Sequence, residues 1–276
     1  MDSSIASQGV VRPCPVCGST RHAVVCVEQE FRIARCAECS FVFLGNPPDD
    51  AGLYDGYHGG SEPDPSAYAG DSPISELREL YAINRQRCAW VNAETSGRTL
   101  LDIGCGRGYF VHSALRHGYA GEGIDIAESA VRYAHDRMNI PVTRSTIESV
   151  ADAGRKFDIV TLWHVLEHFV NPGVALTAVR SLLAPGGQVF LEVPNWNSLK
   201  FALSGRRWEG GNHPKYHRSF FTPSTLRRCL TTAGFSAVRR SRLSYAIPGK
   251  SPAYRIVKLT LNQFGRDAFL DFSARK

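Results

Sequence analysis

From residue 99 onward, short uninterrupted apolar runs alternate with longer segments in which apolar residues recur every three or four positions. The runs have the length of buried strands, and the longer segments have the period of amphipathic helices. Strands are predicted at 99–103, 120–126, 142–144, 157–163 and 188–193, and helices at 73–92, 109–116, 129–137 and 175–183. This alternation predicts an α/β fold in which helices cover both faces of a doubly wound parallel sheet.

The pattern changes after Pro194. Residues 194–221 form a predicted irregular insert, and a helix at 223–233 follows, with Gly234 placed to end it. Two closing strands are predicted at 236–243 and 268–275, with a helix near 254–264 between them. The main domain is therefore expected to span residues 76–276, a length that suits one globular unit.

The N-terminal part lacks the helical period. Short β-like runs occupy 22–27, 31–35 and 41–44, so residues 1–45 are predicted to form a small separate module. Gly, Pro, Asp and Ser dominate the next stretch, and residues 46–75 are expected to be a lid or a linker.

Four of the eight cysteines stand in two C-x-x-C pairs, Cys14/Cys17 and Cys36/Cys39, separated by eighteen residues. Two such pairs can supply four thiolates to one tetrahedral zinc ion, and a four-thiolate site is closed and structural. The alternative is a set of unmetallated or redox cysteines. The remaining four cysteines are scattered, which favours a reducing cytoplasm over a disulfide scaffold. The sequence has no apolar run of about eighteen residues and no signal-like N-terminus, so we expect a cytoplasmic protein without a membrane span.

Charge is distributed unevenly along the chain. The formal net charge is +6, but the residues from Lys200 onward carry +13 and those before it carry −7. A basic C-terminal third is expected to attract an anionic substrate, a nucleic acid or a membrane surface, unless it is only a solvated face.

The segment LLDIGCGRG at 100–108 predicts a nucleotide-type site. A buried strand ends in Asp102, and a glycine-rich turn then opens a helix. Asp125 ends the next strand, where a carboxylate can accept both hydroxyls of a ribose. The Walker lysine motif and the dehydrogenase spacing G-x-G-x-x-G are both absent from the sequence, which argues against phosphate transfer and hydride transfer.

Four segments, LDIGCGRGYF, GIDIAESAV, FDIVTLWHVLEHF and LLAPGGQVFLEVPN, resemble in order and spacing the motifs of class I S-adenosylmethionine-dependent methyltransferases. The resemblance runs from about residue 75 to the C-terminus. It implies a Rossmann-like seven-stranded sheet whose last strand is antiparallel, and S-adenosylmethionine as the cofactor. The cofactor-binding residues that it implies are Asp102, Gly104, Cys105 and Gly106 at the methionine end, Asp125 at the ribose, Ile126, Thr146 and Ile147 at the adenine, Trp163 and His164 near the sulfonium, and Tyr57, with Tyr54, in a lid.

An oxygen acceptor needs a base, and histidines are the natural candidates. His164, Glu167 and His168 follow the fourth strand, and His213 and His217 lie in the insert. The insert also resembles small-molecule methyltransferases, which favours His217 as the base, with His168 and His164 as further catalytic candidates. His164, Glu167 and His168 also form the pattern H-x-x-E-H of some zinc peptidases. In those enzymes both histidines lie on a helix, whereas here the pattern directly follows a predicted strand. Quinone-pathway O-methyltransferases resemble this segment and place a Glu and the adjacent His on a divalent metal, whereas His164 replaces their first carboxylate.

These features predict methylation of a small or carrier-linked molecule, at the oxygen of a sugar, a polysaccharide terminus or a secondary metabolite that bears an anionic group. Three alternatives stay open: a ribosomal or transfer RNA methyltransferase, a non-catalytic zinc-module scaffold, and a sugar C-methyltransferase. The sequence leaves the oligomeric state undetermined.

Overall fold

The computed structural model of the 276-residue chain describes residues 11–49, 62–203, 214–241, 245 and 247–276. Its main sheet has seven strands in the order β10-β11-β8-β7-β4-β5-β6. Their bounds are β4 Thr99–Ile103, β5 Ala120–Asp125, β6 Val142–Arg144, β7 Phe157–Trp163, β8 Leu183–Pro194, β10 Ser236–Arg240 and β11 Phe269–Arg275. The last strand, β11, is antiparallel to both of its neighbours, β8 and β10. The predicted Rossmann-like sheet is thereby confirmed.

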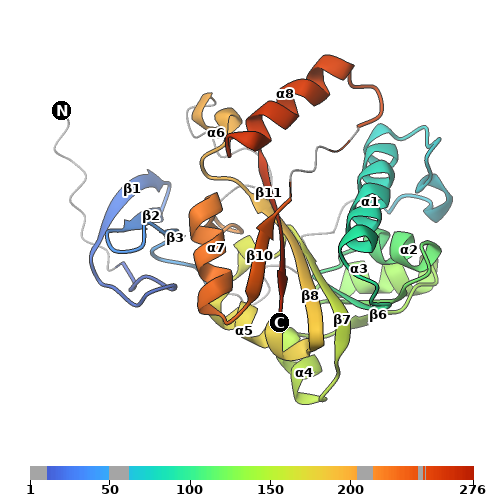
Figure 1. Cartoon of the computed structure of the whole chain (residues 1–276), viewed down its shortest axis with the longest axis horizontal. Helices are drawn as coiled ribbons and strands as arrows, with labels where there is room; N and C mark the ends of the chain where they lie inside the picture. Colours follow the sequence, from blue (N-terminus) through green and yellow to red (C-terminus); the bar gives the residue numbers. More distant parts are fainter. Residues whose placement is uncertain (1–10, 50–61, 204–213, 242–244, 246) are drawn as a thin grey trace.

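Helices cover both faces of this sheet (Figure 1). One layer contains α1 (Ser75–Glu94), α2 (Tyr109–Arg116) and α3 (Glu128–Arg132), and the other contains α4 (Ile147–Asp152), α5 (Pro172–Leu182) and α7 (Pro223–Thr232). Burial on both faces explains why the central strands are nearly continuous apolar runs, as in β7, where six of the seven residues are buried.

Several boundaries differ from the predicted ones. The helix expected at 129–137 is α3 followed by a π-helical turn, Tyr133–Arg137. Strand β8 begins at Leu183 rather than 188, because Leu183 already pairs with Phe157 of β7. The insert expected to be irregular contains α6 (Leu199–Leu203) and β9 (Ser219–Phe220). A strand of two residues is defined by its distant partner, so local periodicity does not reveal it.

The N-terminal module has the three expected strands, β1 (His22–Glu28), β2 (Phe31–Cys36) and β3 (Val42–Leu44), paired antiparallel. A fourth strand completes its sheet, and this strand is β9, which comes from the insert some 175 residues later along the chain. The module lies beside α5 and α7 (Figure 1).

Strand order creates a crevice at one edge of the main sheet. Strand β4 lies between β5 and β7. The chain runs outward from β4 through β5 and β6 on one side, and then crosses back to β7 and β8 on the other side. Ligands of doubly wound sheets bind outside the carboxyl ends of the strands at such a switch point. Helix α8 (Pro252–Gln263) lies beyond this edge (Figure 1). Among the helices that the structure describes, none is both long and apolar enough to cross a membrane.

Candidate functional site

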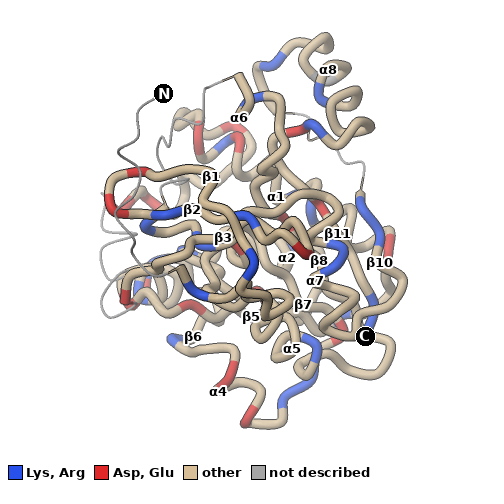
Figure 2. The backbone as a smooth tube through the Cα atoms, turned by 90° about the vertical axis from the view of Figure 1, so that its left-hand side faces the viewer, with Lys and Arg blue, Asp and Glu red and all other residues tan. Residues whose placement is uncertain are grey.

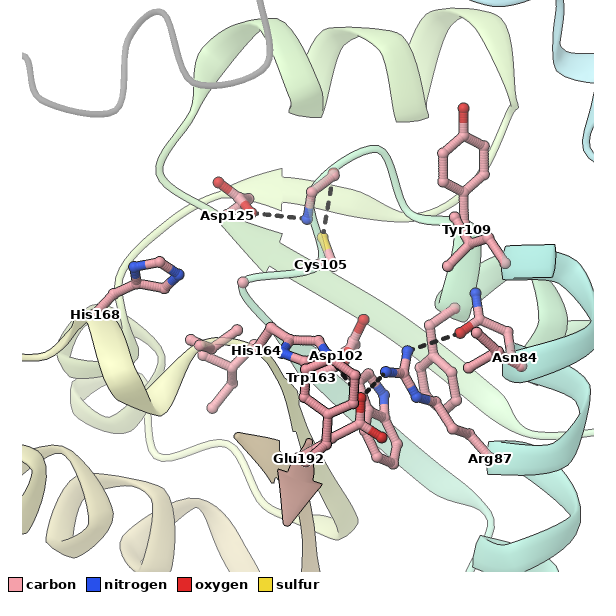
Figure 3. A pocket seen from close by; sticks show the side chains of 18 of the residues that line it. Asn84, Arg87, Asp102, Cys105, Tyr109, Asp125, Trp163, His164, His168 and Glu192 are labelled. Carbon is pink, nitrogen blue, oxygen red and sulfur yellow. Dashed lines mark hydrogen bonds and ion pairs between the residues drawn. The ribbon is translucent and has the colours of Figure 1, made fainter. Parts of the chain in front are cut away.

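A cavity of about 1240 Å³ opens at the switch point (Figure 3). The glycine-rich turn after β4 and the ends of β5 and β7 form its sides, and residues of α1 and α8 close it. All the predicted cofactor residues in the described part of the chain line this cavity. Tyr57, like Tyr54 and His213, lies outside the described residues.

The glycine turn adopts a backbone that other residues avoid. Gly104 has φ +64° and Gly106 has φ +53°, both in the left-handed region. A Cβ atom on Gly104 would lie 2.6 Å from Cγ2 of Val165, so a side chain there would collide with the segment after β7. The glycines therefore let the turn adopt its left-handed backbone, and Gly104 lets it pack closely against Val165.

Asp125 holds the glycine turn from the next strand. Its Oδ2 accepts a hydrogen bond from the Gly106 N–H at 2.7 Å, and its Oδ1 accepts one from the Ala127 N–H at 2.8 Å. A carboxylate has about four acceptor positions, so two remain for hydroxyl groups of a ligand. Ile126, Thr146 and Ile147 line the cavity next to it, and the Thr146 hydroxyl caps α4 by accepting from the Ser149 N–H.

Asp102 is the penultimate residue of β4, directly before the turn, and is almost completely buried. The Thr161 hydroxyl donates to its Oδ1 at 2.6 Å, yet burial raises the pKa of Asp102 to about 7. A cationic ligand group beside this carboxyl would favour its ionised form. The α-amino group of an amino-acid ligand supplies such a cation.

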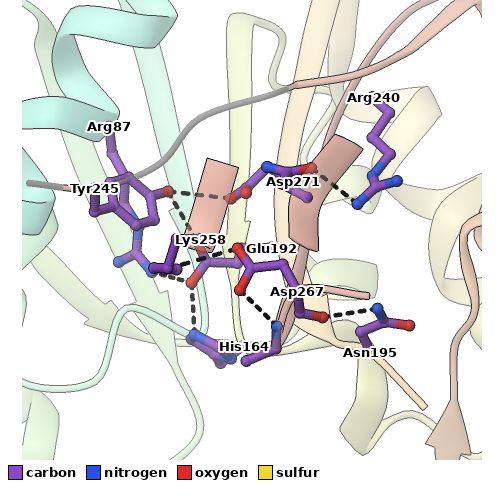
Figure 4. Close-up of polar contacts among 11 residues, drawn as sticks. Arg87, His164, Glu192, Asn195, Arg240, Tyr245, Lys258, Asp267 and Asp271 are labelled. Carbon is purple, nitrogen blue, oxygen red and sulfur yellow. Dashed lines mark hydrogen bonds and ion pairs between the residues drawn. The ribbon is translucent and has the colours of Figure 1, made fainter. Parts of the chain in front are cut away.

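A buried ion pair that the sequence did not reveal forms the floor of the cavity (Figures 3 and 4). Arg87 of α1 donates through Nη2 to Oε1 of Glu192 in β8 at 2.7 Å, and its guanidinium lies 4.5 Å from the ring centroid of Trp163. The Tyr245 hydroxyl donates to Oε2 of Glu192 at 2.7 Å. Burial would raise the pKa of Glu192, but the charge of Arg87 and a hydrogen bond from His164 outweigh burial and hold that pKa well below its usual range.

His164 joins the same group of charges with φ +59°, an unusual backbone angle for histidine. Its Nε2 lies 2.7 Å from Oε1 of Glu192, and its Nδ1 lies 3.6 Å from Oε1 of Glu167. Burial would lower the pKa of His164, but the two carboxylates outweigh burial and raise it to about 9. His164 is therefore an imidazolium at neutral pH and has no free nitrogen to accept a proton.

Glu167, His168 and His217 form a second polar cluster. Their candidate ligand atoms all lie within 4.8 Å of one another. Glu167 is 1% exposed, and neither of its carboxylate oxygens has a hydrogen-bond partner among the described residues. Burial would raise the pKa of Glu167, but the neighbouring imidazoles, His164 first, outweigh burial and lower it. A divalent cation would satisfy such an ionised carboxylate, and the three side chains fit a small metal ion.

The two histidines of this cluster occupy different positions. His168 lines the cavity, with its Nδ1 bound to the Tyr216 carbonyl at 3.0 Å. His217 lies behind it, with ring centroids 4.9 Å apart, and is not among the residues that line the cavity. Burial lowers the pKa of His217 to about 4, so its imidazole is neutral at pH 7.

The four paired cysteines meet in the N-terminal module, as the spacing predicts. Their Sγ atoms lie within 4.8 Å of one another, with 3.5 Å between those of Cys14 and Cys39 and between those of Cys17 and Cys36. A tetrahedral zinc ion with Zn–S bonds of about 2.3 Å places its sulfurs about 3.8 Å apart. The cluster fits that geometry after small adjustments.

A signal for the missed ion pair is present in the sequence. Glu192 interrupts the apolar run VFLEV of a strand expected to be buried, and Arg87 lies within a helix that faces the sheet. A charge in a buried strand needs a partner. Arg87 and Glu192 are 105 positions apart, so the sequence does not reveal that they are partners.

The comparisons with known proteins agree with this geometry. The methyltransferase-domain family matches residues 74–240. Ubiquinone biosynthesis O-methyltransferases are similar to this chain: that of Acinetobacter baumannii strain AYE is 32% identical over 187 residues, covering 62% of this chain and 78% of the relative. That of Bordetella pertussis is 30% identical over 210 residues, covering 69% and 83%.

Two solved structures share the fold. A SAM-dependent methyltransferase from Archaeoglobus fulgidus aligns with a TM-score of 0.54 at 20% identity, covering 83% of this chain and 100% of that one. The plantazolicin methyltransferase BpumL in complex with SAH aligns with a TM-score of 0.52 at 18% identity, covering 81% and 93%. The chain belongs to the methyltransferase-domain family, and it is an S-adenosylmethionine-dependent methyltransferase of class I.

Proposed function

We propose that this enzyme transfers the methyl group of S-adenosylmethionine to an oxygen atom of a small or carrier-linked acceptor that bears an anionic group. Candidate acceptors are secondary metabolites, sugars and polysaccharide termini. The observation that carries the proposal is the cavity itself, with a glycine turn and two aspartates at one end, and His168 with several cations at the other.

At the first end, Asp125 would accept the ribose hydroxyls and Asp102 would face the methionine amino group. Trp163 and the Arg87–Glu192 pair would lie under the sulfonium, because they form the cavity floor between the two ends. Methyl transfer is an in-line displacement, and alignment of donor and acceptor can contribute about 7–11 kcal/mol.

At the acceptor end, the wall provided by α8 is apolar, with Val257 and Leu261, and basic, with Lys258. Lys200 of α6 and Arg266 also line this end. Figure 2 marks basic positions on α6 and on α8. Lys258 forms an ion pair at 3.8 Å with Asp267, which also lines the cavity, so the excess positive charge at this end comes from Lys200 and Arg266. An acceptor with an apolar body and a phosphate or carboxylate group would match this lining. The similarity to ubiquinone biosynthesis O-methyltransferases supports an oxygen acceptor.

The acceptor hydroxyl must lose a proton as the methyl group arrives. His168 is the group best placed to accept it, because it lines the cavity whereas His217 lies behind it. The Tyr216 carbonyl would then hold the His168 ring through Nδ1, and the carboxylate of Glu167 would balance the charge that His168 gains. Glu167, His168 and His217 also fit a divalent cation, which would lower the pKa of a bound acceptor hydroxyl so that its proton can leave to solvent rather than to His168.

We further propose that Cys14, Cys17, Cys36 and Cys39 bind a structural Zn²⁺, as their geometry supports. Metal analysis of protein purified without chelators should find about one zinc per chain.

Mass spectrometry and NMR of products from an acceptor panel test the proposal. The panel contains hydroxylated aromatic acids, sugar phosphates, nucleotide sugars and their uncharged analogues, with RNA as a contrasting substrate. We expect O-methylation of an anionic member and a marked loss for its uncharged analogue. Methylation at nitrogen or carbon, or of RNA, would refute the assignment.

His168→Gln should lower the turnover by about 10²–10⁴-fold, the usual contribution of a general base. His135→Gln is the control, because His135 is exposed and pairs with Asp136 outside the cavity. Chelation that abolishes activity while the module keeps its zinc, with recovery on adding Mg²⁺, would assign the cluster to a metal instead.

A further inference from the structure

The N-terminal module and the catalytic half of the chain share one β-sheet. Strand β9 pairs with β3 in an antiparallel register that places Phe220 opposite Val42 and Ser219 opposite Phe43. The Leu44 N–H also donates to the Arg218 carbonyl at 2.9 Å. The module therefore supplies hydrogen-bond partners for the backbone that directly follows His217.

The same segment bonds on its other side to the turn that carries the acceptor-side cluster. The Arg218 N–H donates to the Glu167 carbonyl at 2.8 Å, and the Ser219 hydroxyl donates to the Phe169 carbonyl at 2.9 Å. The His168 ring bonds to the Tyr216 carbonyl. Hydrogen bonds thus run without a break from β3 through residues 216–220 to Glu167 and His168.

A side chain next to the first cysteine pair reinforces this connection. Arg12, two residues before Cys14, donates through Nη2 to the Val170 carbonyl at 2.6 Å and through Nη1 to Oδ1 of Asn171 at 3.2 Å. Its Nε donates to the Leu44 carbonyl at 3.1 Å. Arg12 therefore ties the start of the module to both β3 and the loop that follows His168.

The cysteine cluster is packed against the same region. Cys14, Cys36 and Cys39 belong to the main buried apolar cluster, which includes residues of β3, α7 and the segment after β9 and extends to β4 and β5. Within it the rings of Phe41 and Phe221 lie 5.4 Å apart. The four cysteines are not among the described residues that line the cavity, so any effect of their metal on the reaction is indirect.

We infer that the zinc module is a positioning element for the acceptor side of the active site. The inference rests on the proposed zinc site and on the proposed role of His168. Zinc holds β2 and β3 in place, β3 holds β9, and β9 holds Glu167, His168 and His217 in register with the cavity. The cofactor end depends on β4 and β5, which have no hydrogen bond to the module in the described part of the chain.

Cys17→Ser tests the inference, because Cys17 is the most accessible of the four ligands and its loss perturbs the core least. Cys26→Ser is the matched control, since Cys26 lies in β1 of the same module outside the cluster. We expect Cys17→Ser to lose zinc, to exchange the backbone amides of 216–221 faster, and to bind S-adenosylhomocysteine within twofold of the wild type. With the best acceptor of the panel, kcat should fall about 10- to 100-fold while KM for S-adenosylmethionine is unchanged.

Arg12→Met is a second variant that leaves all four thiolates in place. It should keep its zinc and show a smaller increase in exchange at 216–221, together with a lower kcat. If Cys17→Ser loses zinc but keeps wild-type exchange and kcat, the positioning role is refuted while the zinc assignment stands. If Cys17→Ser loses affinity for S-adenosylhomocysteine by the same factor as it loses kcat, the positioning role is also refuted, because zinc would then support the whole fold. Absence of zinc from the wild type would overturn both.

Discussion

Replacing Asp125 by Asn tests the cofactor end of the cavity most directly. The two side chains have nearly the same size, so the substitution changes hydrogen bonding and charge without opening a void. In the wild type, Oδ1 and Oδ2 each accept from a backbone N–H, those of Ala127 and Gly106. An amide offers one oxygen and one NH₂ group, so one backbone N–H must face another donor.

The magnitude follows from these contacts. A hydrogen bond to a charged group contributes about 1.5–3 kcal/mol, so the free energy of unfolding of Asp125→Asn should fall by about that amount without ligand. If Asp125 also accepts a ribose hydroxyl, the variant loses a second bond of the same kind. The affinity for S-adenosylhomocysteine should then fall by roughly 10- to 160-fold.

Isothermal titration calorimetry with S-adenosylhomocysteine, together with urea unfolding, measures both effects. Asp158→Asn is the control for the loss of charge, at the amino edge of the sheet. Its Oδ2 alone accepts from the backbone N–H groups of Arg98 and Thr99, so a single amide oxygen can keep both bonds. The control should lose less stability than Asp125→Asn and keep its affinity within twofold. A folded Asp125→Asn variant with wild-type affinity would remove Asp125 from the cofactor site.

Three further outcomes are expected. Gly104→Ala should lower the free energy of unfolding by about 1–2 kcal/mol for the left-handed backbone alone, and by more as Val165 moves, in the same urea assay; unchanged stability would contradict this. Arg87→Met should cost about 3–5 kcal/mol because it removes one of the two cations that pair with the buried Glu192 and leaves only His164, and Arg87→Met/Glu192→Gln should recover part of that loss. The pKa of His164 is raised from 6.5 to about 9 in the folded state, so its stabilising contribution is complete below pH 6.5 and is lost as the pH rises towards 9. The stability difference between the wild type and His164→Gln should shrink over that interval, and a constant difference would exclude the ionised pair.

Local patterns predicted the central sheet because each buried parallel strand is a compact apolar run with turn residues at its end. The segment 100–108 is the clearest case: its strand, its turn and Asp102 are all encoded within nine residues. The cysteine cluster could also be predicted from the sequence, because two C-x-x-C pairs define a site almost independently of the rest of the fold.

Features that depend on contacts between distant segments could not be predicted in the same way. Strand β9 has two residues, and nothing in Ser219 or Phe220 indicates pairing with β3. The sequence of the insert made His217 a candidate base because it is a histidine. Its position behind His168 depends on the pairing of β9 with β3. Sequence motifs predicted histidines as candidate bases in this region, but tertiary structure determines which histidine faces the cavity.

The two buried glutamates near the cavity differ in how many hydrogen-bond partners their carboxylate oxygens have, and this difference indicates different roles. Both oxygens of Glu192 are occupied, Oε1 by Arg87 and His164 and Oε2 by Tyr245, so this carboxylate has no capacity to take a proton from an acceptor. Glu167 is equally buried, yet neither oxygen has a hydrogen-bond partner among the described residues. One positive charge already lies near Glu167, because Nδ1 of the His164 imidazolium is 3.6 Å from its Oε1. Protonation of His168 during the reaction, or a bound cation, would place a second positive charge beside it. Glu167 would then lower the cost of that step while Glu192 maintains the fold.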